Sequence, residues 1–215
     1  MSPSQAAYEV RHFLAAPRAE NDMRQKWVLE KWGFAGVPGG RVMEIGPGPY
    51  GGCLPFIEAA EKVAVDPLYQ AYRASRLLDW NENWVVSPRY VEDLRSESIE
   101  TLRCDAILCF NVLEHGTSGF DSIDKIVPMM KPGGRFYLEQ SLRTAAQLNE
   151  AHDHVMTLGD LHAAIERNGL EVIQHWVEPP QPGFDYPAVI GIYEKGAHHE
   201  VDKDNRGANF WELYT

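Results

Sequence analysis

The sequence predicts an α/β protein with a doubly wound, mostly parallel sheet that ends in an antiparallel pair of strands. Apolar strand-like runs alternate with helix-like segments from residue 41 to about residue 167, a pattern typical of parallel sheets built from repeated crossovers. The last two runs, at 171–177 and 188–193, are separated by a proline-rich turn, which indicates two strands that pair directly. A glycine turn after the first run indicates a ligand site at one edge of the sheet.

Length and composition favour one structural domain. The 215 residues are enough to bury one substantial core, and the hydrophobic fraction of 44% is typical of a globular protein. No linker rich in proline, glycine or serine divides the chain. We expect a helical cap over residues 1–40, the main domain over residues 41–195 and a polar tail over residues 196–215.

The acidic charge disfavours some classes of partner, and the cysteine content speaks against disulfides and a structural zinc site. The net charge of −11 disfavours nucleic acid, because a phosphate backbone attracts a basic surface. Only three cysteines occur, and their spacing fits neither a disulfide framework nor a zinc knuckle. No run reaches the roughly 18 apolar residues that span a bilayer, and the first residues lack the pattern of a signal peptide. We therefore expect a cytoplasmic protein without membrane or nucleic-acid partners, and the sequence indicates no oligomeric state.

Two helices are expected before the first strand. Residues 4–14 and 19–32 carry apolar side chains at helical spacing, and Pro17 separates them. Their aromatic residues are Tyr8, Phe13, Trp27 and Trp32. Aromatic residues at this spacing pack in a core more often than they contact a substrate, so we favour core packing. A glycine-rich loop over residues 33–40 then leads into the first strand.

The first strand, residues 41–45, runs into a turn rich in glycine and proline. Glu44 lies near the end of this strand, and Gly46 and Gly48 flank Pro47 just beyond it. Glycine permits a close approach of the backbone to a ligand, and ligands of open α/β sheets bind at the carboxyl ends of the strands. The turn therefore indicates a nucleotide or nucleoside site, although Gly-x-Gly also occurs for turn geometry alone.

An acidic residue at the end of the second strand supports this interpretation. A helical segment over residues 53–61 is expected before a strand over residues 62–65, and Asp66 and Pro67 follow this strand. An acid about 20 residues after the glycine turn can accept hydrogen bonds from both hydroxyls of a ribose. The alternatives are that Asp66 only forms a turn and that Glu44 is a solvated strand end.

The third strand is less clearly marked. A helix is expected over residues 69–80, and residues 84–86 and 89–91 are both candidates for the next strand. Glu92 and Asp93 follow directly. An acid in this position can accept a hydrogen bond from the exocyclic amine of a bound base, or it can simply begin a surface loop.

The fourth strand is the clearest of the set. Residues 104–110 are nearly all apolar, as expected of a central parallel strand that is buried on both faces, and Asn111 follows. Residues 119–130 have helical spacing, which Pro128 must interrupt. A turn at Lys131–Gly134 leads to a fifth strand over residues 135–139.

A final helix precedes the last pair of strands. Thr157 and Asp160 have the spacing of a capping box, which predicts a helix that runs to about Arg167. Gly169 then provides a residue suited to terminate it.

The ordered motifs resemble those of the class I S-adenosylmethionine-dependent methyltransferases. They are Glu44–Gly48, Val65–Pro67, Phe110–His115 and Lys131–Gly134. The resemblance covers roughly residues 41–193, and residues 154–157 resemble the small-molecule branch of that family. It implies a Rossmann-like fold with seven strands, the last of them antiparallel, and S-adenosylmethionine as cofactor.

The same resemblance implies a role for each motif. Glu44 and the glycine turn would hold the methionine end, Asp66 the ribose, and Glu92 or Asp93 the adenine, while Asn111 and Val112 would line the sulfonium side. The full implied set is Glu44, Gly46, Pro47, Gly48, Asp66, Pro67, Glu92, Asp93, Asn111 and Val112. Tyr50 departs from the family pattern, since many members have a third glycine there, and this puts the path of the loop in doubt.

Methyl transfer from a sulfonium centre asks little of the protein beyond alignment and exclusion of water. Aligning the nucleophile at ~3 Å from the methyl group contributes ~7 kcal/mol or more. A hydroxyl acceptor would gain ~10²-fold or more from a base, for which His115 and His154 are the candidates. Each of the two has a purely structural alternative, such as capping a loop. The run His152–His154 is too short to supply three ligands to one ion, so no metal is expected.

We therefore predict direct methyl transfer to an oxygen or nitrogen of a small metabolite. An NAD-dependent oxidoreductase stays open as an alternative, because Gly46, Gly48 and Gly51 satisfy the pattern Gly-x-Gly-x-x-Gly. A silent module that only binds an adenosyl ligand is the second alternative. The later motifs favour the methyltransferase. Phe110–Leu113 lacks the Asn-Pro-Pro-aromatic pattern that DNA methyltransferases acting on amino groups carry at the corresponding strand end, so a nucleic-acid substrate is disfavoured. A protein acceptor is harder to exclude, because acidic enzymes can bind basic peptides.

Overall fold

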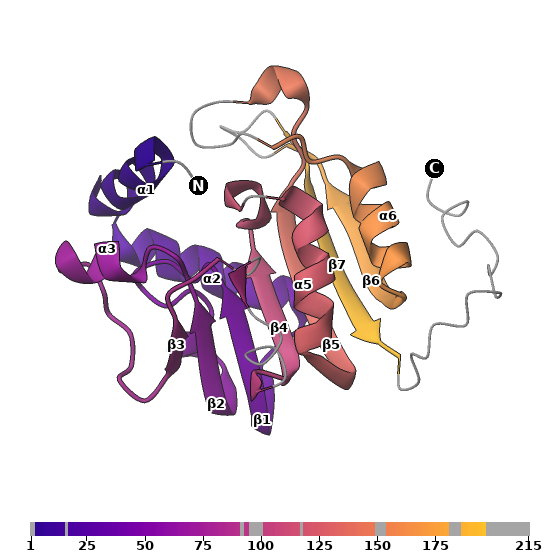
Figure 1. The fold of residues 1–215 in the computed structure, drawn as a ribbon, viewed down its shortest axis with the longest axis horizontal. Helices are drawn as coiled ribbons and strands as arrows, with labels where there is room; N and C mark the ends of the chain where they lie inside the picture. Colours follow the sequence, from indigo (N-terminus) through magenta and orange to yellow (C-terminus); the bar gives the residue numbers. More distant parts are fainter. Residues whose placement is uncertain are drawn as a thin grey trace.

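The protein is built on one seven-stranded sheet of order β3-β2-β1-β4-β5-β7-β6 (Figure 1). The computed structural model describes residues 3–15, 17–90, 93–94, 101–116, 118–148, 154–180 and 186–196. Strands β1 to β5 are parallel, whereas β7 is antiparallel to both of its neighbours, β5 and β6. The predicted doubly wound sheet with an antiparallel last strand is confirmed, and the carboxyl ends of the parallel strands share one edge.

Most of the predicted elements form close to their expected positions. The strands are β1 (Gly36–Ile45), β2 (Glu58–Val65), β3 (Val85–Ser87), β4 (Cys104–Phe110), β5 (Met130–Ser141), β6 (Leu170–Glu178) and β7 (Ala188–Lys195). The α-helices are α1 (Pro3–Ala15), α2 (Arg18–Trp32), α3 (Tyr69–Ala74), α5 (Ile123–Ile126) and α6 (Leu158–Arg167). Short 3₁₀ helices are η1 (Leu54–Phe56), η3 (Leu113–His115), η4 (Gly119–Ser122), η5 (Val127–Met129) and η6 (Ala145–Gln147). Among the described residues, every helix is too short or too polar to cross a bilayer.

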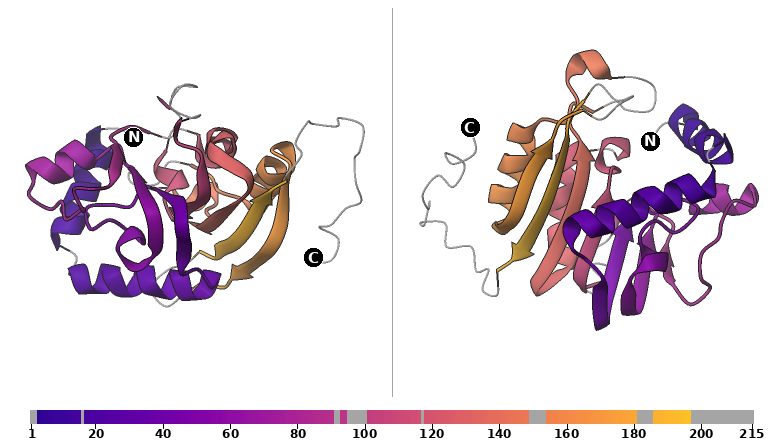
Figure 2. Two further views of the ribbon diagram at one scale, coloured as in Figure 1. Left: turned by 90° about the horizontal axis from the view of Figure 1, so that it is seen from below. Right: turned by 180° about the vertical axis from the view of Figure 1, so that it is seen from behind.

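Different helices cover the two faces of the sheet. Helices α5 and α6 lie on one face, where Ile123 and Leu161 pack on Ile107 and Phe136 of the strands. Helix α2 crosses the opposite face (Figure 2). There Trp32 is buried and its indole Nε1 donates a hydrogen bond of 3.3 Å to the carbonyl of Leu138 in β5. Helix α2 is therefore part of the core of the sheet domain.

The two predicted N-terminal helices are confirmed, but the loop after them is shorter than expected. Pro17 separates α1 from α2, and α2 ends at Gly33, whose φ is 61°. Strand β1 already begins at Gly36, which pairs with Glu58 of β2. A Cβ at Gly36 would lie 2.1 Å from the carbonyl oxygen of Glu58, so only glycine fits there. The pairing of β1 with β2 shifts in register between Val37 and Arg41. This irregular part of the strand is the segment that the sequence indicated as a loop.

The helix predicted over residues 53–61 is wrong. The connection from β1 to β2 holds only the single turn η1, and β2 starts at Glu58. Gly48, Gly51 and Gly52 take φ values of 68°, 84° and 57°, which no right-handed helix contains. The Glu44 carboxylate also binds amides inside this connection. These contacts fold the segment as a tight turn, despite the helical spacing of its apolar residues.

Helix α3 is also shorter than predicted. It ends at Ala74 rather than near residue 80, because the backbone reverses at Arg76, where φ is 57°. Strand β3 then matches the first of the two candidate segments, residues 84–86. The chain returns to the sheet over a loop that carries Trp80 and Trp84, which pack on the α2 face.

The second half of the chain follows the prediction closely. Helical turns run from η4 through α5 to η5, and Pro128 lies in η5, where it interrupts the α-helix. Lys131–Gly134 forms an irregularity within β5, with Gly133 at a φ of 71°, so the strand begins at Met130. Thr157 accepts a hydrogen bond from the Asp160 amide at 3.1 Å, which confirms the predicted cap of α6.

Candidate active site

A cavity of about 390 Å³ opens at the carboxyl edge of the sheet. Its floor is formed by the residues that follow β1, β2 and β4, and helices α1 and α2 contribute its outer wall. In Figure 1, α1 lies beyond this edge of the strands. The volume is in the range of small-molecule sites, and the place is where open α/β sheets bind their ligands.

The glycine turn after β1 forms one wall of the cavity. Gly46, Pro47 and Gly48 all line it. Gly46 has a φ of 65°, and a Cβ on it would lie 2.1 Å from Cγ2 of Val112. A Cβ on Gly48 would lie 3.0 Å from the ring of Phe13 in α1. Close packing therefore requires glycine at position 46, and Gly48 is favoured by its φ of 68° and by the nearby ring of Phe13. Together the two glycines leave exposed backbone that a ligand can approach.

Asp66 lies at the floor of the cavity and is almost fully buried. Its Oδ2 accepts a hydrogen bond of 3.0 Å from the Gly48 amide, and its Oδ1 accepts one of 2.8 Å from the Leu68 amide. Burial raises the pKa of Asp66 to about 6, and the two amides oppose the shift. The carboxylate thus faces the cavity from a fixed position, with Pro67 beside it in the lining.

Glu44 lies behind the glycine turn rather than in the lining of the cavity. Its Oε1 and Oε2 accept hydrogen bonds from the Cys53 amide at 3.1 and 2.8 Å, and Oε2 accepts another from the Leu54 amide at 3.1 Å. A Cβ on Gly52 would collide with this carboxylate at 2.1 Å. The structure therefore gives Glu44 the task of shaping the turn. Burial raises the pKa of Glu44 to about 8, against the effect of the amides.

Asn111 and Val112 follow β4 and line the cavity beside the glycine turn. Asn111 has a φ of 49°, an uncommon conformation for a residue other than glycine. Its side-chain Oδ1 accepts a hydrogen bond of 3.0 Å from the Ser141 amide. This bond ties the end of β4 to the end of β5 and aims Val112 at Gly46.

The residues proposed to recognise a base are only partly described. Glu92 lies outside the described residues, and Asp93 is exposed and absent from the lining of the cavity. Arg89 and Tyr90, which lie just before Val91 and these two acids, do line it. The structure therefore brings this loop to the cavity through residues that the motif comparison did not single out.

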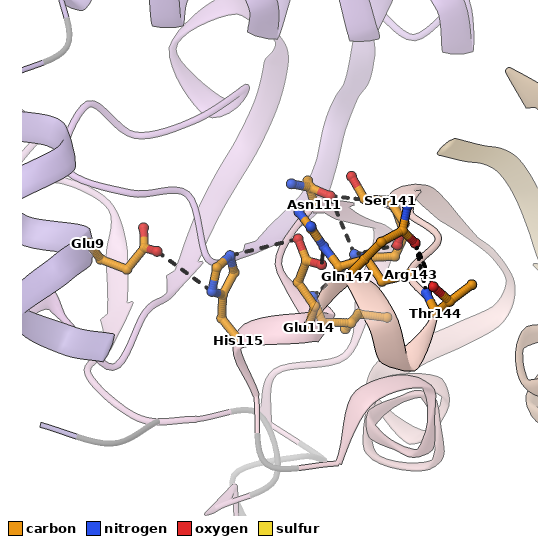
Figure 3. A network of polar contacts seen from close by, with 10 residues as sticks. Glu9, Asn111, Glu114, His115, Ser141, Arg143, Thr144 and Gln147 are labelled. Atoms are coloured by element: carbon orange, nitrogen blue, oxygen red, sulfur yellow. Dashed lines mark hydrogen bonds and ion pairs between the residues drawn. The ribbon is translucent and has the colours of Figure 1, made fainter. Parts of the chain in front are cut away.

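His115 and Glu9 face one another inside the cavity (Figure 3). His115 Nδ1 lies 3.7 Å from Oε1 of Glu9 on α1, and His115 Nε2 lies 4.0 Å from Oε1 of Glu114. Burial raises the pKa of Glu9 to about 7, and the charges of Glu114 and Asp66 add to the shift. Of the two candidate bases, His115 is the one that lines the cavity.

His154 lies one layer behind the cavity. Its Nε2 is 2.9 Å from the carbonyl oxygen of Gly116, which itself lines the cavity, while His154 does not. The structure therefore separates the two candidate histidines. His152 and Asp153 lie outside the described residues, and no three His, Cys, Asp or Glu side chains of the described residues are grouped as metal ligands.

A buried ion pair supports the segment that carries His115. Arg143 Nε donates to Glu114 Oε2 at 2.5 Å, and the two side chains are 4% and 0% exposed. The guanidinium also lies 3.9 Å from the ring centroid of Tyr186. Arg143 and Tyr186 both line the cavity, so the ion pair of Arg143 with Glu114 anchors η3 to this part of the wall.

Sequence analysis missed several residues of this wall. They are Glu9, Arg24, Tyr72, Arg89, Tyr90, Arg143 and Tyr186. Core packing and substrate contact were the two roles considered for the N-terminal aromatic residues. Tyr8 and Phe13 line the cavity, whereas Trp32 is buried in the core. Trp27 does neither and is 38% exposed. One available signal was that Glu9 is the only acid in α1, a helix otherwise rich in apolar side chains.

Solved structures share this fold at low sequence identity. The N-methyltransferase NodS from Bradyrhizobium japonicum WM9, solved with S-adenosyl-L-homocysteine, is 16% identical with a TM-score of 0.62, and the match covers 89% of this chain and 98% of NodS. The [4+2]-cyclase SpnF is 13% identical with a TM-score of 0.62, over 82% of this chain and 81% of SpnF. Because one relative is a cyclase, the likeness shows the fold and leaves the reaction open.

Sequence comparison is more specific. A ubiquinone biosynthesis O-methyltransferase from Xanthomonas campestris pv. campestris (strain B100) is 31% identical over 133 residues, which are 60% of this chain and 53% of that protein. The chain spans about half the length of the curated relatives it matches. The family described as "Methyltransferase domain" matches residues 9–175, a stretch that begins inside α1 and includes β1 to β5. The resemblance seen in the motifs is confirmed, and the chain belongs to this methyltransferase family.

Proposed function

We propose that this protein is an S-adenosylmethionine-dependent methyltransferase that acts on a small molecule. The observation that supports it most is the fixed position of Asp66 beneath Gly48, at the floor of a cavity that the glycine turn borders. A carboxylate at the end of the second strand suits the two hydroxyls of a ribose, and an adjacent turn without side chains suits a close ligand.

The residues present fit the cofactor. Asp66 would hold the ribose, and the backbone of Gly46 and Gly48 would hold the methionine end. Tyr90 and Arg89 would contribute to the adenine side, together with Glu92 or Asp93. Asn111 and Val112 would border the sulfonium, while Glu44 would act by shaping the turn. The bound cofactor supplies an activated methyl group, and the chain supplies alignment and exclusion of water.

The acceptor is proposed to be a small metabolite that is methylated at oxygen or nitrogen. Helices α1 and α2 border the cavity, and its volume of about 390 Å³ is in the range of small-molecule sites. The named relatives include an O-methyltransferase and an N-methyltransferase, so both chemistries occur in this fold. His115 is the proposed base, and His154 is proposed to support it by holding the Gly116 segment.

Isothermal titration calorimetry tests this proposal with two adenosyl ligands. The protein should bind S-adenosylhomocysteine with micromolar affinity and show no comparable binding of NAD. Binding of NAD alone would contradict the methyltransferase and support an oxidoreductase. Binding of neither ligand at millimolar concentration would instead indicate a silent module. Incubation with S-adenosylmethionine and a metabolite extract, followed by mass spectrometry, should then reveal a product heavier by one methylene unit.

A further inference from the structure

Glu9 and His115 come from segments far apart in the chain and meet inside the cavity. Glu9 lies on α1 and His115 on η3, and Glu9 Oε1 is 3.7 Å from His115 Nδ1 (Figure 3). Their side chains are only 15% and 13% exposed. A carboxylate at this distance from an imidazole favours its protonated form, and the effect is stronger where water is excluded.

The second carboxylate near His115 differs from Glu9 in its own partner. Glu114 lies 4.0 Å from His115 Nε2, but Arg143 binds the same carboxylate at 2.5 Å from a buried position. Arg143 therefore compensates much of the charge of Glu114. Among the described residues, Glu9 forms no ion pair with a lysine or arginine. Glu9 is thus the carboxylate whose charge acts most directly on His115.

The surroundings of the pair favour exchange of a proton near neutral pH. Burial is the main cause that raises the pKa of Glu9 to about 7, followed by the charges of Glu114 and Asp66. The charge of Glu9 also contributes to the raised pKa of Tyr72, of which burial is the main cause, so Tyr72 stays neutral. Near pH 7 the Glu9 carboxyl group can therefore take up a proton without large cost.

We propose that Glu9 positions His115 and increases its basicity, so that His115 accepts the proton of a hydroxyl acceptor and the reaction is an O-methylation. This inference rests on the proposed function. The acceptor oxygen forms the new bond to the methyl carbon as the carbon–sulfur bond breaks, and sulfur keeps that electron pair. The hydroxyl proton passes to His115, and the imidazolium that results lies beside Glu9. The positive charge lost at sulfur is thereby regained on the histidine.

The chemistry of the acceptor explains why such a pair selects oxygen. A neutral amine already presents a free lone pair and needs no base before the attack. A hydroxyl is a weak nucleophile until its proton begins to leave, and a positioned base contributes about 10²-fold or more. A histidine supported by a buried carboxylate is the arrangement that supplies this base at neutral pH.

The first experiment measures the pKa of His115 directly. Nuclear magnetic resonance titration of the imidazole should be compared for the unmodified protein, Glu9→Gln and Glu20→Gln, each with S-adenosylhomocysteine present. Glu20 lies exposed in the first turn of α2 and serves as the control. The resonance that His115→Asn removes identifies the residue. Glu9→Gln should lower the pKa of His115 by about one unit or more, and Glu20→Gln should not. An unchanged pKa in Glu9→Gln overturns the inference.

The second experiment identifies the atom that is methylated. The protein is incubated with S-adenosylmethionine labelled with ¹³C in its methyl group and a small-molecule extract, and the product is analysed by ¹³C resonance. A methyl group on oxygen supports the inference, and Glu9→Gln should then lose about tenfold or more of the rate at neutral pH while retaining affinity for S-adenosylhomocysteine. A methyl group on nitrogen overturns the inference but leaves the proposed function intact. No labelled product from the unmodified protein would count against the proposed function itself.

Discussion

The Gly48 amide donates a hydrogen bond of 3.0 Å to Oδ2 of Asp66, which joins the turn after β1 to the end of β2. The two segments implied to hold different parts of one ligand are thus a single unit. Phe13 of α1 packs over Gly48 from the other side, so the N-terminal helix also depends on this unit.

The Asp66→Ala variant should bind S-adenosylhomocysteine at least tenfold more weakly, because it loses both the acceptor for ribose hydroxyls and the bond that places Gly48. A tenfold change corresponds to about 1.4 kcal/mol of binding free energy. Calorimetry measures it directly. The matched control is Asp124→Ala, which removes an exposed acid that pairs with Arg167, and neither residue lines the cavity. Equal affinities in the two variants would remove Asp66 from the proposed site.

The Gly46→Ala variant should be more destabilised than Gly133→Ala. Both glycines have positive φ, 65° and 71°, so each alanine costs about 1–2 kcal/mol of backbone strain. Gly46→Ala alone also drives a Cβ to 2.1 Å from Val112, whereas nothing lies within 4 Å of a Cβ at Gly133. Urea unfolding measures the difference. Adding Val112→Ala should restore part of the loss in the first variant and none in the second.

Arg143→Met should lower the free energy of unfolding by about 3–5 kcal/mol, because it leaves the Glu114 carboxylate buried without its partner. The double variant Glu114→Gln/Arg143→Met should be clearly more stable than the single one, since no charge then remains buried. Chemical denaturation of the three proteins forms the test. If the double variant were no more stable than the single one, the cost would come from lost packing against Tyr186.

Glu139→Gln should change how stability depends on pH. Burial raises the pKa of Glu139 from 4.5 to about 7, so its favourable contribution is fully present below pH 4.5 and is lost as the pH rises through 7. The variant should therefore match the unmodified protein near pH 4.5 and exceed its free energy of unfolding by on the order of 2 kcal/mol at pH 8. The control is Glu171→Gln, at an exposed position of β6. A constant difference across this range would contradict the assignment.

Strands and caps were predictable because local sequence decides them. The nearly continuous apolar run 104–110 is typical of a buried strand, and Thr157 with Asp160 could cap a helix without help from elsewhere. The connection from β1 to β2 was not predictable in this way. Its spacing favoured a helix, but the carboxylate of Glu44, from the preceding strand, binds the Cys53 and Leu54 amides and stabilises a tight turn instead.

The residues of the candidate site also differ in how well the sequence predicts them. Asp66, Asn111 and the glycine turn could be located because strand ends meet at one edge of a parallel sheet. Glu9 could not be located in this way, because its position depends on how α1 packs against the rest of the protein. No local sequence pattern predicts that packing. The structure gives His154 a different place from the one that the sequence suggested. Its position after β5 suggested contact with the acceptor, yet the segment folds so that its ring binds the Gly116 carbonyl.

The way α2 crosses the sheet affects where the chain can be cut. With only a single 3₁₀ turn between β1 and β2, much of that face relies on α2 to shield Tyr137 and Ile190 from water. Removing residues 1–40 would remove α2 and expose the apolar face of the sheet to water. We expect the remaining fragment to aggregate for this reason. Any shortened version made for crystallisation or display should therefore keep Arg18 onward.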